Sequence, residues 1–358
     1  MYMIVVGHCL FHGRVTAKLG YGTVNYFLSY LIQSFSVVHV NCFVMLAGYF
    51  SIDREFQAQR LFRFWRQVVF YSVLIGLICS VCIGVTGTDV IKAIFPVSSN
   101  HYWFASVYMG LSLLMPFAGM LAVQLTKKQY QYLLALLALF FSVNHMIFRV
   151  NTYGTYVGRE LPWFLFLALL AGYLKLHTRP DRKYFRYGLL GYAAASLAVL
   201  ASVYLSVRLH QEDIGYFLNY NSPLALAAAG SLFLCVKNMP WQENRLDGWI
   251  QKVAGAAFGV YLIHDNYLIR YQVWDAFRAS RVARTHWAVI YAVLAAGAVY
   301  VICTCLELLR QRIFLKVGKW YAKTAWYVRE QRFCARLDQL IAVADKRGRE
   351  RQAETSDE

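Results

Sequence analysis

Long apolar segments recur along this chain and constrain its fold more than any other feature of the sequence. Runs close to twenty residues long alternate with short polar stretches, and about twenty apolar residues are needed for a helix to cross the roughly 30 Å hydrocarbon core of a bilayer. Because unpaired backbone groups are not tolerated in lipid, such runs must form helices. The sequence therefore predicts an all-α, polytopic protein surrounded by a lipid bilayer.

Composition excludes the main alternatives to a membrane protein. Of the 358 residues, 59% are hydrophobic and 15% are charged, whereas soluble domains average about 25% charged residues. The eight cysteines lie mostly inside apolar runs, where cysteine acts as a small hydrophobic residue, and they lack zinc-ligand spacing, so we expect no metal. The net charge of +17 comes without a nucleic-acid motif, and we expect no nucleic-acid partner.

The apolar runs predict about ten transmembrane helices. The first run, Met1–Leu10, is too short to cross and lacks the flanks of a signal peptide, so we expect a truncated first helix. Leu161–Lys175 and Val253–Ile269 are also short, and either is expected to cross, to be buried or to be re-entrant. The other expected spans are Val24–Phe50, Phe64–Val85, Trp103–Leu125, Tyr130–Phe148, Tyr187–Val207, Phe217–Val236 and Trp287–Leu309.

Basic residues occupy alternate loops and thereby predict the orientation. They gather at 54–66, 127–128, 175–186 and 237–252, and cytoplasmic loops are the ones enriched in lysine and arginine. Both termini are therefore expected in the cytoplasm of a multi-pass cell-membrane protein. One loop disagrees with this rule, because Arg270, Arg278, Arg281 and Arg284 fall on the outer side.

The composition changes near residue 310, which predicts a membrane domain at 1–309 and a basic cytoplasmic tail at 310–358. In the tail, aromatic and aliphatic residues recur at roughly helical spacing between arginines. This pattern predicts an amphipathic helix that lies on the anionic inner leaflet.

His8 is the most promising chemical group in the apolar segments. Ionisable residues at membrane depth are costly and usually face a cavity, and histidine can accept and return a proton near neutral pH. A histidine that only hydrogen-bonds a neighbouring helix is the other interpretation. Chemistry alone favours that structural role.

Arg60, Arg63 and Arg66 recur at every third position where a helix begins on the expected cytoplasmic side. Guanidinium groups suit phosphate oxygens because they offer a planar fork of donors, so a phosphate-rich ligand such as acyl-coenzyme A would fit. Contact with lipid headgroups explains the same pattern and is the simpler interpretation of these residues alone.

Four further residues are expected to line a cavity: Asn41, Trp103, Tyr261 and His264. Asn41 lies in an apolar run and needs a buried partner. Trp103 fits an interfacial aromatic belt and stacking on a sugar ring equally well. His264 stands beside Asp265, and because adjacent helical residues do not face each other, a structural hydrogen bond is favoured over an oriented base.

Four motifs, in this order, resemble the membrane-bound acyltransferase 3 family. They are an apolar first helix ending in His8, the phenylalanine-rich run Phe43–Phe50, the pair Arg60-x-x-Arg63, and Gly259–His264. Residues 102–116 are also similar to the family's Trp-Phe helix, and the resemblance extends to about residue 310.

Two positions depart from the family pattern. The arginine that the family places before the histidine would fall ahead of Met1, and Ala47 replaces the serine of a Ser-Gly-Tyr step.

The resemblance implies an acyltransferase that moves an acyl group, often acetyl, from a cytoplasmic donor to a hydroxyl. The acceptor would be a cell-surface glycan, a lipid-linked sugar or another sugar-containing molecule. The resemblance assigns His8 as catalytic base or acyl carrier, and Arg60 and Arg63 as residues that hold acyl-CoA.

 The expected donor is thus acetyl-CoA, and no metal takes part. A base mechanism and a covalent acyl-histidine are both open at this point.

A different class of function fits the same apolar pattern. A membrane carrier or flippase for a polar or lipid-linked solute would also need many spans and a few intramembrane polar groups. Such proteins are commonly built from repeated halves, and the sequence shows no internal repeat. A scaffold without chemistry is the third class, and it would leave His8 and Arg60 freely replaceable.

Overall fold

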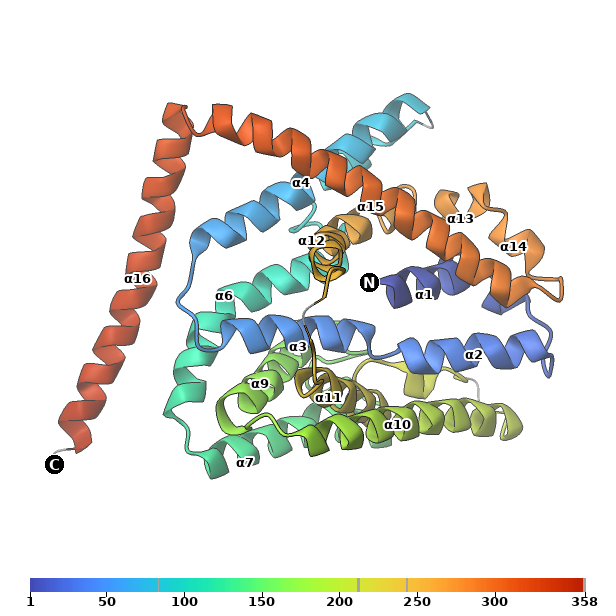
Figure 1. The fold of residues 1–358 in the computed structure, drawn as a ribbon, viewed down its shortest axis with the longest axis horizontal. Coiled ribbons are helices and arrows are strands. Elements are labelled where there is room, and N and C mark those ends of the chain that lie inside the picture. The colour runs from blue at the N-terminus through green and yellow to red at the C-terminus, as the bar shows by residue number, and fades with distance from the viewer. Residues whose placement is uncertain (83, 211–212, 243, 357–358) are drawn as a thin grey trace.

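The computed structural model describes residues 1–82, 84–210, 213–242 and 244–356, and every regular element in that part of the chain is helical (Figure 1). The helices in the first half are α1 (Tyr2–His12), α2 (Val24–Ser36), α3 (His39–Ser51), α4 (Ala58–Cys82), α5 (Gly87–Ile94), α6 (Trp103–Gln124), α7 (Lys127–Ala138) and α8 (Asn144–Phe148). Those in the second half are α9 (Leu161–His177), α10 (Arg182–Arg208), α11 (Pro223–Lys237), α12 (Asp247–His264), α13 (Gln272–Ala276), α14 (Ala279–Val282), α15 (Ala288–Tyr321) and α16 (Ala325–Ser356).

Six segments of the described chain are long and apolar enough to cross a membrane. They confirm the all-α, multi-pass prediction, whereas the count of ten spans stays a prediction. Helix α9 is apolar but shorter. The six segments are Val24–Ser51, Ala58–Cys82, Trp103–Gln124, Lys127–Phe148, Arg182–Arg208 and Ala288–Tyr321.

Local sequence signals explain where several helices begin. The Thr126 side chain accepts from the Gln129 backbone N–H, and the Gln129 side chain accepts from the Thr126 N–H, a reciprocal cap that satisfies two otherwise unpaired donors at the start of α7. At α11, the Ser222 side chain caps the first turn and Pro223 follows at the first helical position, where its missing N–H costs nothing.

The expected span Val24–Phe50 is two helices. Helix α2 ends at Ser36 and α3 begins at His39, while Val37 and Val38 join them with φ/ψ values still in the right-handed helical region. Both valines are buried. The joint is therefore a local bend in one membrane-crossing segment, and apolar periodicity alone does not reveal it.

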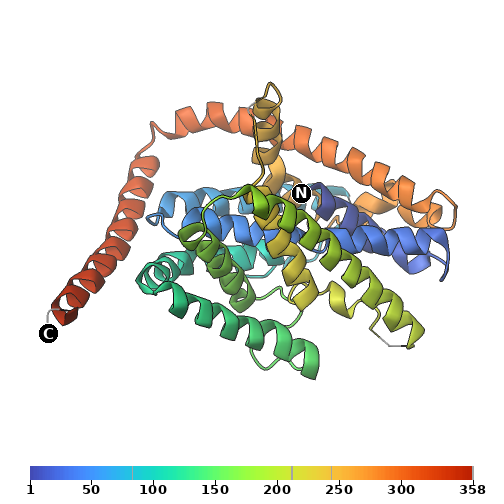
Figure 2. The ribbon, with the colours of Figure 1, turned by 60° about the horizontal axis from the view of Figure 1, so that its bottom comes forward.

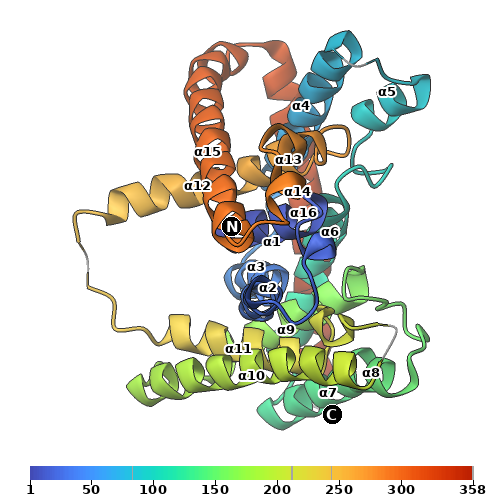
Figure 3. The same cartoon turned by 90° about the vertical axis from the view of Figure 1, so that its right-hand side faces the viewer.

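Helices α1, α2 and α3 occupy the middle of the molecule. Figure 3 shows α4, α12 and α15 on one side of them and α7, α9, α10 and α11 on the other, in agreement with Figure 1. Gly48 lets α3 approach α9 closely, because a Cβ atom at this position would overlap the backbone of Ala168. Small residues permit such close contact between membrane helices, and α3 is thus fixed at the centre of the fold.

The last two helices extend beyond the expected membrane domain. Helix α15 continues past Leu309 to Tyr321. Helix α16 then runs crosswise to the bundle and stands away from it along most of its length (Figures 1 and 2). Polar contacts tie α16 to the start of α4: the Arg66 guanidinium donates to Glu330 Oε1 at 2.6 Å, and Asp338 Oδ1 accepts the Ala58 N–H at 2.8 Å.

Candidate functional site

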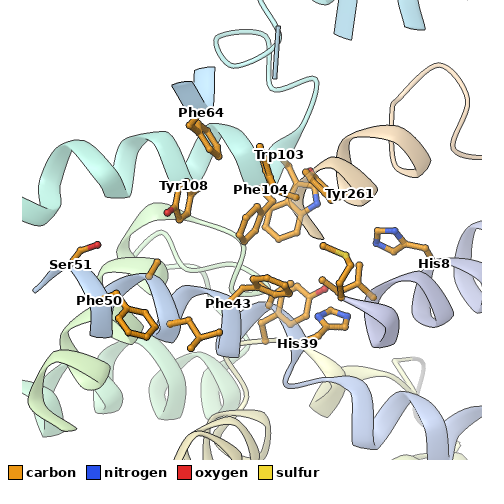
Figure 4. Close-up of a pocket in the computed structure, with 17 residues that line it drawn as sticks. His8, His39, Phe43, Phe50, Ser51, Phe64, Trp103, Phe104, Tyr108 and Tyr261 are labelled. Atoms are coloured by element: carbon orange, nitrogen blue, oxygen red, sulfur yellow. The ribbon is translucent and has the colours of Figure 1, made fainter. Parts of the chain in front are cut away.

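An apolar cavity of about 420 Å³ lies at the centre of the fold (Figure 4). One face of α3 forms one wall, and its residues recur every three to four positions as a helix requires. Aromatic residues of α4, α6 and α12 form the facing wall. The α3 residues are His39, Val40, Phe43, Leu46, Ala47, Phe50 and Ser51, and the facing aromatic residues are Phe64, Trp103, Phe104, Tyr108, Phe258 and Tyr261.

Two smaller cavities adjoin the ends of the apolar cavity. The first, of about 210 Å³, is lined by Arg60 and shares four residues with the apolar cavity, namely Ala47, Ser51, Phe64 and Tyr108. The second, of about 220 Å³, is lined by Arg159 and shares another four residues, namely His8, His39, Trp103 and Tyr220. We name them the Arg60 cavity and the Arg159 cavity. The three cavities form a row along α3, whose residues from His39 to Ser51 span about 18 Å at the helical rise.

His8 lies where the apolar cavity meets the Arg159 cavity, and a chain of two hydrogen bonds connects its ring through His264 to a backbone carbonyl. His8 Nδ1 is 3.0 Å from His264 Nε2, and His264 Nδ1 is 2.6 Å from the carbonyl oxygen of Val260. A carbonyl can only accept, so His264 carries its proton on Nδ1 and accepts at Nε2 when neutral. His8 then donates from Nδ1, and its Nε2 keeps a lone pair. This chain of hydrogen bonds sets the tautomer that a general base needs.

Asp265 places a carboxylate beside the same ring. Its Oδ1 lies 3.5 Å from His8 Nδ1 and 3.3 Å from His12 Nε2. Helix α12 ends at His264, and Asp265 leaves the helical conformation with φ −104° and ψ 16°, so these neighbours in sequence both reach the histidines of α1. The expectation that adjacent residues do not face one partner applies to a continuous helix. Here the helix end removes that restriction, and Asp265 can stabilise positive charge on His8.

One group of side chains has the spacing of a metal site. His8, His12 and Asp265 each offer one ligand atom, and these atoms all lie within 4.8 Å of one another; imidazole and carboxylate are common ligands of divalent metals. His8 Nδ1, however, lies at hydrogen-bonding distance from His264, so a metal bound at Nδ1 would have to replace that bond. The absence of a metal cofactor stays a prediction from the sequence.

The structure separates the expected cavity-lining residues into two groups. Trp103 and Tyr261 line the apolar cavity. Asn41 lines none of the three cavities: it is fully buried behind the wall, where its Nδ2 donates to the Tyr220 carbonyl at 2.8 Å and its Oδ1 accepts from Trp163 at 3.1 Å. His264 is also fully buried and reaches the cavities only through His8.

The two expected donor-binding arginines also differ. Arg60 lines its cavity together with Arg54 and Gln57. Arg63 is exposed, lines none of the three cavities, and donates from Nε to the Gln59 carbonyl at 3.5 Å. Only the first guanidinium therefore faces the row of cavities directly.

Three residues at the site were not found from the sequence. His39 lines two of the cavities, and its ring centroid lies 5.5 Å from that of Tyr220. A histidine within an apolar run is the signal that could have found it, as it did for His8. Tyr220 and Arg159 lie outside the long helices, in segments where no spacing links them to His8.

A buried carboxylate gives a physical reason for the glycine of the Gly259–His264 motif. Glu307 is fully buried and accepts from Tyr71 at 2.6 Å and from Arg310 Nη2 at 2.6 Å. A Cβ atom at Gly259 would overlap this carboxylate. The glycine thus lets α12 pack against α15 while the charge of Glu307 stays paired.

The apolar helices and the polar groups enclosed between them define a multi-pass membrane protein with an internal row of cavities. The chain belongs to the acyltransferase 3 family: the family model described as an acyltransferase domain matches residues 1–307. Neither the curated proteins nor the solved structures compared with the chain gave a match. The family resemblance seen in the sequence is confirmed, and the protein is an acyltransferase.

Proposed function

We propose that this enzyme transfers an acyl group, acetyl being the expected one, from cytoplasmic acyl-CoA to a hydroxyl of a cell-surface glycan or other sugar-containing acceptor. The observation that carries the proposal is the position of His8. Its ring lies at the junction of two cavities, and its hydrogen bond to His264 leaves Nε2 as a free acceptor. A base in this place can be reached from both ends of the row.

The donor is proposed to bind from the Arg60 cavity. Arg60 would pair with phosphate oxygens of coenzyme A, and Arg63 would add positive charge at the entrance. The apolar face of α3 between Ser51 and His39 suits the uncharged pantetheine arm, which must carry the thioester to His8. The row is about 18 Å long over this distance, which is similar to the reach of that arm.

The proposed chemistry uses His8 as a general base. His8 Nε2 takes the proton from the acceptor hydroxyl while its oxygen attacks the thioester carbonyl carbon, so that a C–O bond forms and the C–S bond breaks. The imidazolium then returns the proton to the departing thiolate of coenzyme A. Asp265, 3.5 Å from His8 Nδ1, would stabilise the imidazolium while it exists.

The proposed topology places the Arg60 cavity at the inner membrane surface. The loops near it are the lysine- and arginine-rich ones, which favour the cytoplasm. Ten spans, with α1 counted among them, are part of this proposal. Helix α16, crosswise to the bundle (Figure 1), is then suited to lie along the inner leaflet, with both termini in the cytoplasm.

The test is transfer of labelled acetyl from acetyl-CoA to membrane glycan by wild type and His8→Ala. We expect the variant to lose activity at least about 100-fold, because that is the usual contribution of a general base. His286→Ala is the matched control, since His286 is exposed. Equal labelling by wild type and His8→Ala would remove this residue from the mechanism and overturn the proposal.

Transport is the second function to test, because a row of cavities through the fold would also suit a carrier or flippase. A carrier predicts counterflow of labelled sugar in proteoliposomes without any acyl donor. The proposed acyltransferase predicts no counterflow and strict dependence on acyl-CoA. If the acyl group is first transferred to His8, the enzyme should release one equivalent of coenzyme A before any acceptor is added.

A further inference from the structure

The Arg159 cavity contains two guanidinium groups, those of Arg159 and Arg270. Within the described residues, neither has a carboxylate at ion-pair distance. The one carboxylate that lines this cavity, Asp265, lies 3.3 Å from His12 and 3.5 Å from His8. The cavity therefore carries more positive than negative charge beside the proposed base.

Arg270 is held in place but not satisfied. Its guanidinium carbon lies 5.3 Å from the ring centroids of both Tyr267 and Tyr271. Its Nε is buried and has no hydrogen-bond partner in the described part of the chain. A buried donor left unpaired costs free energy, so the protein itself does not fully satisfy the guanidinium that lines this cavity.

Arg159 stands over an aromatic platform in the same cavity. The rings of Trp103 and Tyr220 are nearly parallel, with centroids 6.3 Å apart and 16° between planes. The Arg159 guanidinium carbon lies 5.3 Å from the Trp103 centroid and 5.9 Å from that of Tyr220. Stacking on rings fixes the plane of a guanidinium while its N–H groups can still bind an anion.

The sequence gives an independent sign of the same preference. The segment that contains Arg270, Arg278, Arg281 and Arg284 falls on the side where the distribution of basic residues disfavours them. Topology does not explain these arginines, because lysine and arginine are normally enriched on the cytoplasmic side. An anionic ligand that approaches from this side would explain them, since positive charge raises its local concentration.

We propose that the Arg159 cavity binds an acceptor sugar that carries an anionic group, a carboxylate or a phosphate, next to the hydroxyl that is acylated. This inference rests on the proposed function and specifies its substrate class. Arg159 and Arg270 bind the anionic oxygens, the sides of Trp103 and Tyr220 that line the cavity contact the sugar ring, and His8 receives the hydroxyl proton at the edge of the same cavity.

The experiment compares three labelled probes on the full chain in nanodiscs of neutral lipid: a glucuronate disaccharide, glucose 1-phosphate and a neutral glucose disaccharide. We expect at least one anionic probe to bind about tenfold more tightly than the neutral one, and this preference to weaken with added salt. The anionic probe that binds more tightly shows whether the cavity prefers a carboxylate or a phosphate. Equal binding of all three probes would overturn the proposal.

Variants separate the two arginines from the general charge of the segment. Arg159→Gln and Arg270→Gln should each weaken binding of the anionic probe about tenfold, and Arg159→Lys should recover part of it. The control Arg281→Gln lies in the same arginine-rich segment, is exposed and lines none of the three cavities, so it should bind as wild type does. An equal loss in the control would mean that nonspecific charge, and not this cavity, binds the probe.

A third variant distinguishes failure of this inference from failure of the proposed function. His8→Ala should abolish acetyl transfer and leave anionic binding unchanged. If transfer persists in His8→Ala while anionic binding depends on Arg159, the base mechanism fails and the binding site stands. If transfer depends on His8 while anionic and neutral sugars serve equally, with the same KM, the mechanism stands and this inference fails. Variants that do not elute as a single folded species leave the wild-type probe comparison to decide.

Discussion

The two ends of the row of cavities differ in how firmly their functional groups are held. At one end, His8 is 20% exposed and bonded to the fully buried His264, with Asp265 nearby. At the other end, Arg60 and Arg63 are exposed at the start of α4. The His8 end is therefore ordered before any substrate binds. At the Arg60 end, the arginine side chains become ordered only when a ligand binds them.

The chemistry proposed for each end explains this difference. A general base is effective only if its nitrogen is placed within hydrogen-bonding distance of the reacting proton. A phosphate group can instead be held by guanidinium groups that stay hydrated until it arrives. We infer that changes at the His8 end should lower the rate of the chemical step, and that changes at the Arg60 end should lower the affinity for the donor.

The largest effect should come from moving α3, the helix that contributes lining residues to all three cavities. In Gly48→Leu the new side chain would overlap the backbone of α9 at Ala168, and overpacking of this kind forces helices apart. We expect little folded protein, measured as the monodisperse fraction in detergent. Gly230→Leu is the control, because a Cβ atom at Gly230 has nothing within 4 Å; equal behaviour of the two variants would mean that α3 is not fixed by this contact.

The next largest effect should come from changes to His264, which test the His8 end alone. His264→Phe removes the acceptor for His8 Nδ1, so kcat should fall about 10- to 100-fold, as for other groups that orient a histidine, while KM for acyl-CoA stays the same. His264→Asn keeps an acceptor oxygen and should recover part of the rate. A rate for His264→Phe equal to wild type would show that the tautomer of His8 does not depend on this bond.

A smaller effect should come from changes to Arg60 and Arg63, which test the Arg60 end alone. Arg60→Gln should raise KM for acyl-CoA about tenfold with little change in kcat, because it removes a charge-assisted bond to phosphate. Arg63→Gln should raise KM less, since Arg63 lines none of the cavities. If Arg60→Gln lowered kcat and left KM unchanged, the assignment of donor affinity to the Arg60 end would be wrong.

The smallest effect concerns Ala47, the position where the resemblance leads us to expect serine. Ala47 lines both the apolar cavity and the Arg60 cavity, so Ala47→Ser would add one hydroxyl to the surface of the row. We expect rates within about twofold of wild type, as for substitutions that disturb no buried contact. A large gain in donor affinity would instead show that the alanine weakens the Arg60 end.

The sequence predicts most of the helical organisation because the signals are local. Apolar length and loop charge depend on neighbouring residues, and they mark α4, α6, α10 and α15, although α15 continues past the expected end at Leu309 to Tyr321. The bend between α2 and α3 escapes this reasoning, because Val37 and Val38 are as apolar as the residues around them.

The site is predictable only in part because its contacts are not local. His8 and His264 each stand out in the sequence, but their bond joins positions 256 residues apart, and no periodicity reports it. His39 carries the same signal as His8, an ionisable group in an apolar run. Arg159 has no such signal, because an arginine in a loop is nothing unusual in the sequence. Its place at the site becomes evident only from the fold, which puts it over the Trp103 ring.

The contact between Asp338 and the Ala58 N–H gives the C-terminal tail a role at the proposed donor end. The first turn of a helix has N–H groups without partners, and here a carboxylate 280 positions later supplies one acceptor. Shortening the tail would remove that acceptor together with Glu330, the partner of Arg66. A protein trimmed at its end for purification would therefore start α4 from a loosened first turn, two residues before Arg60.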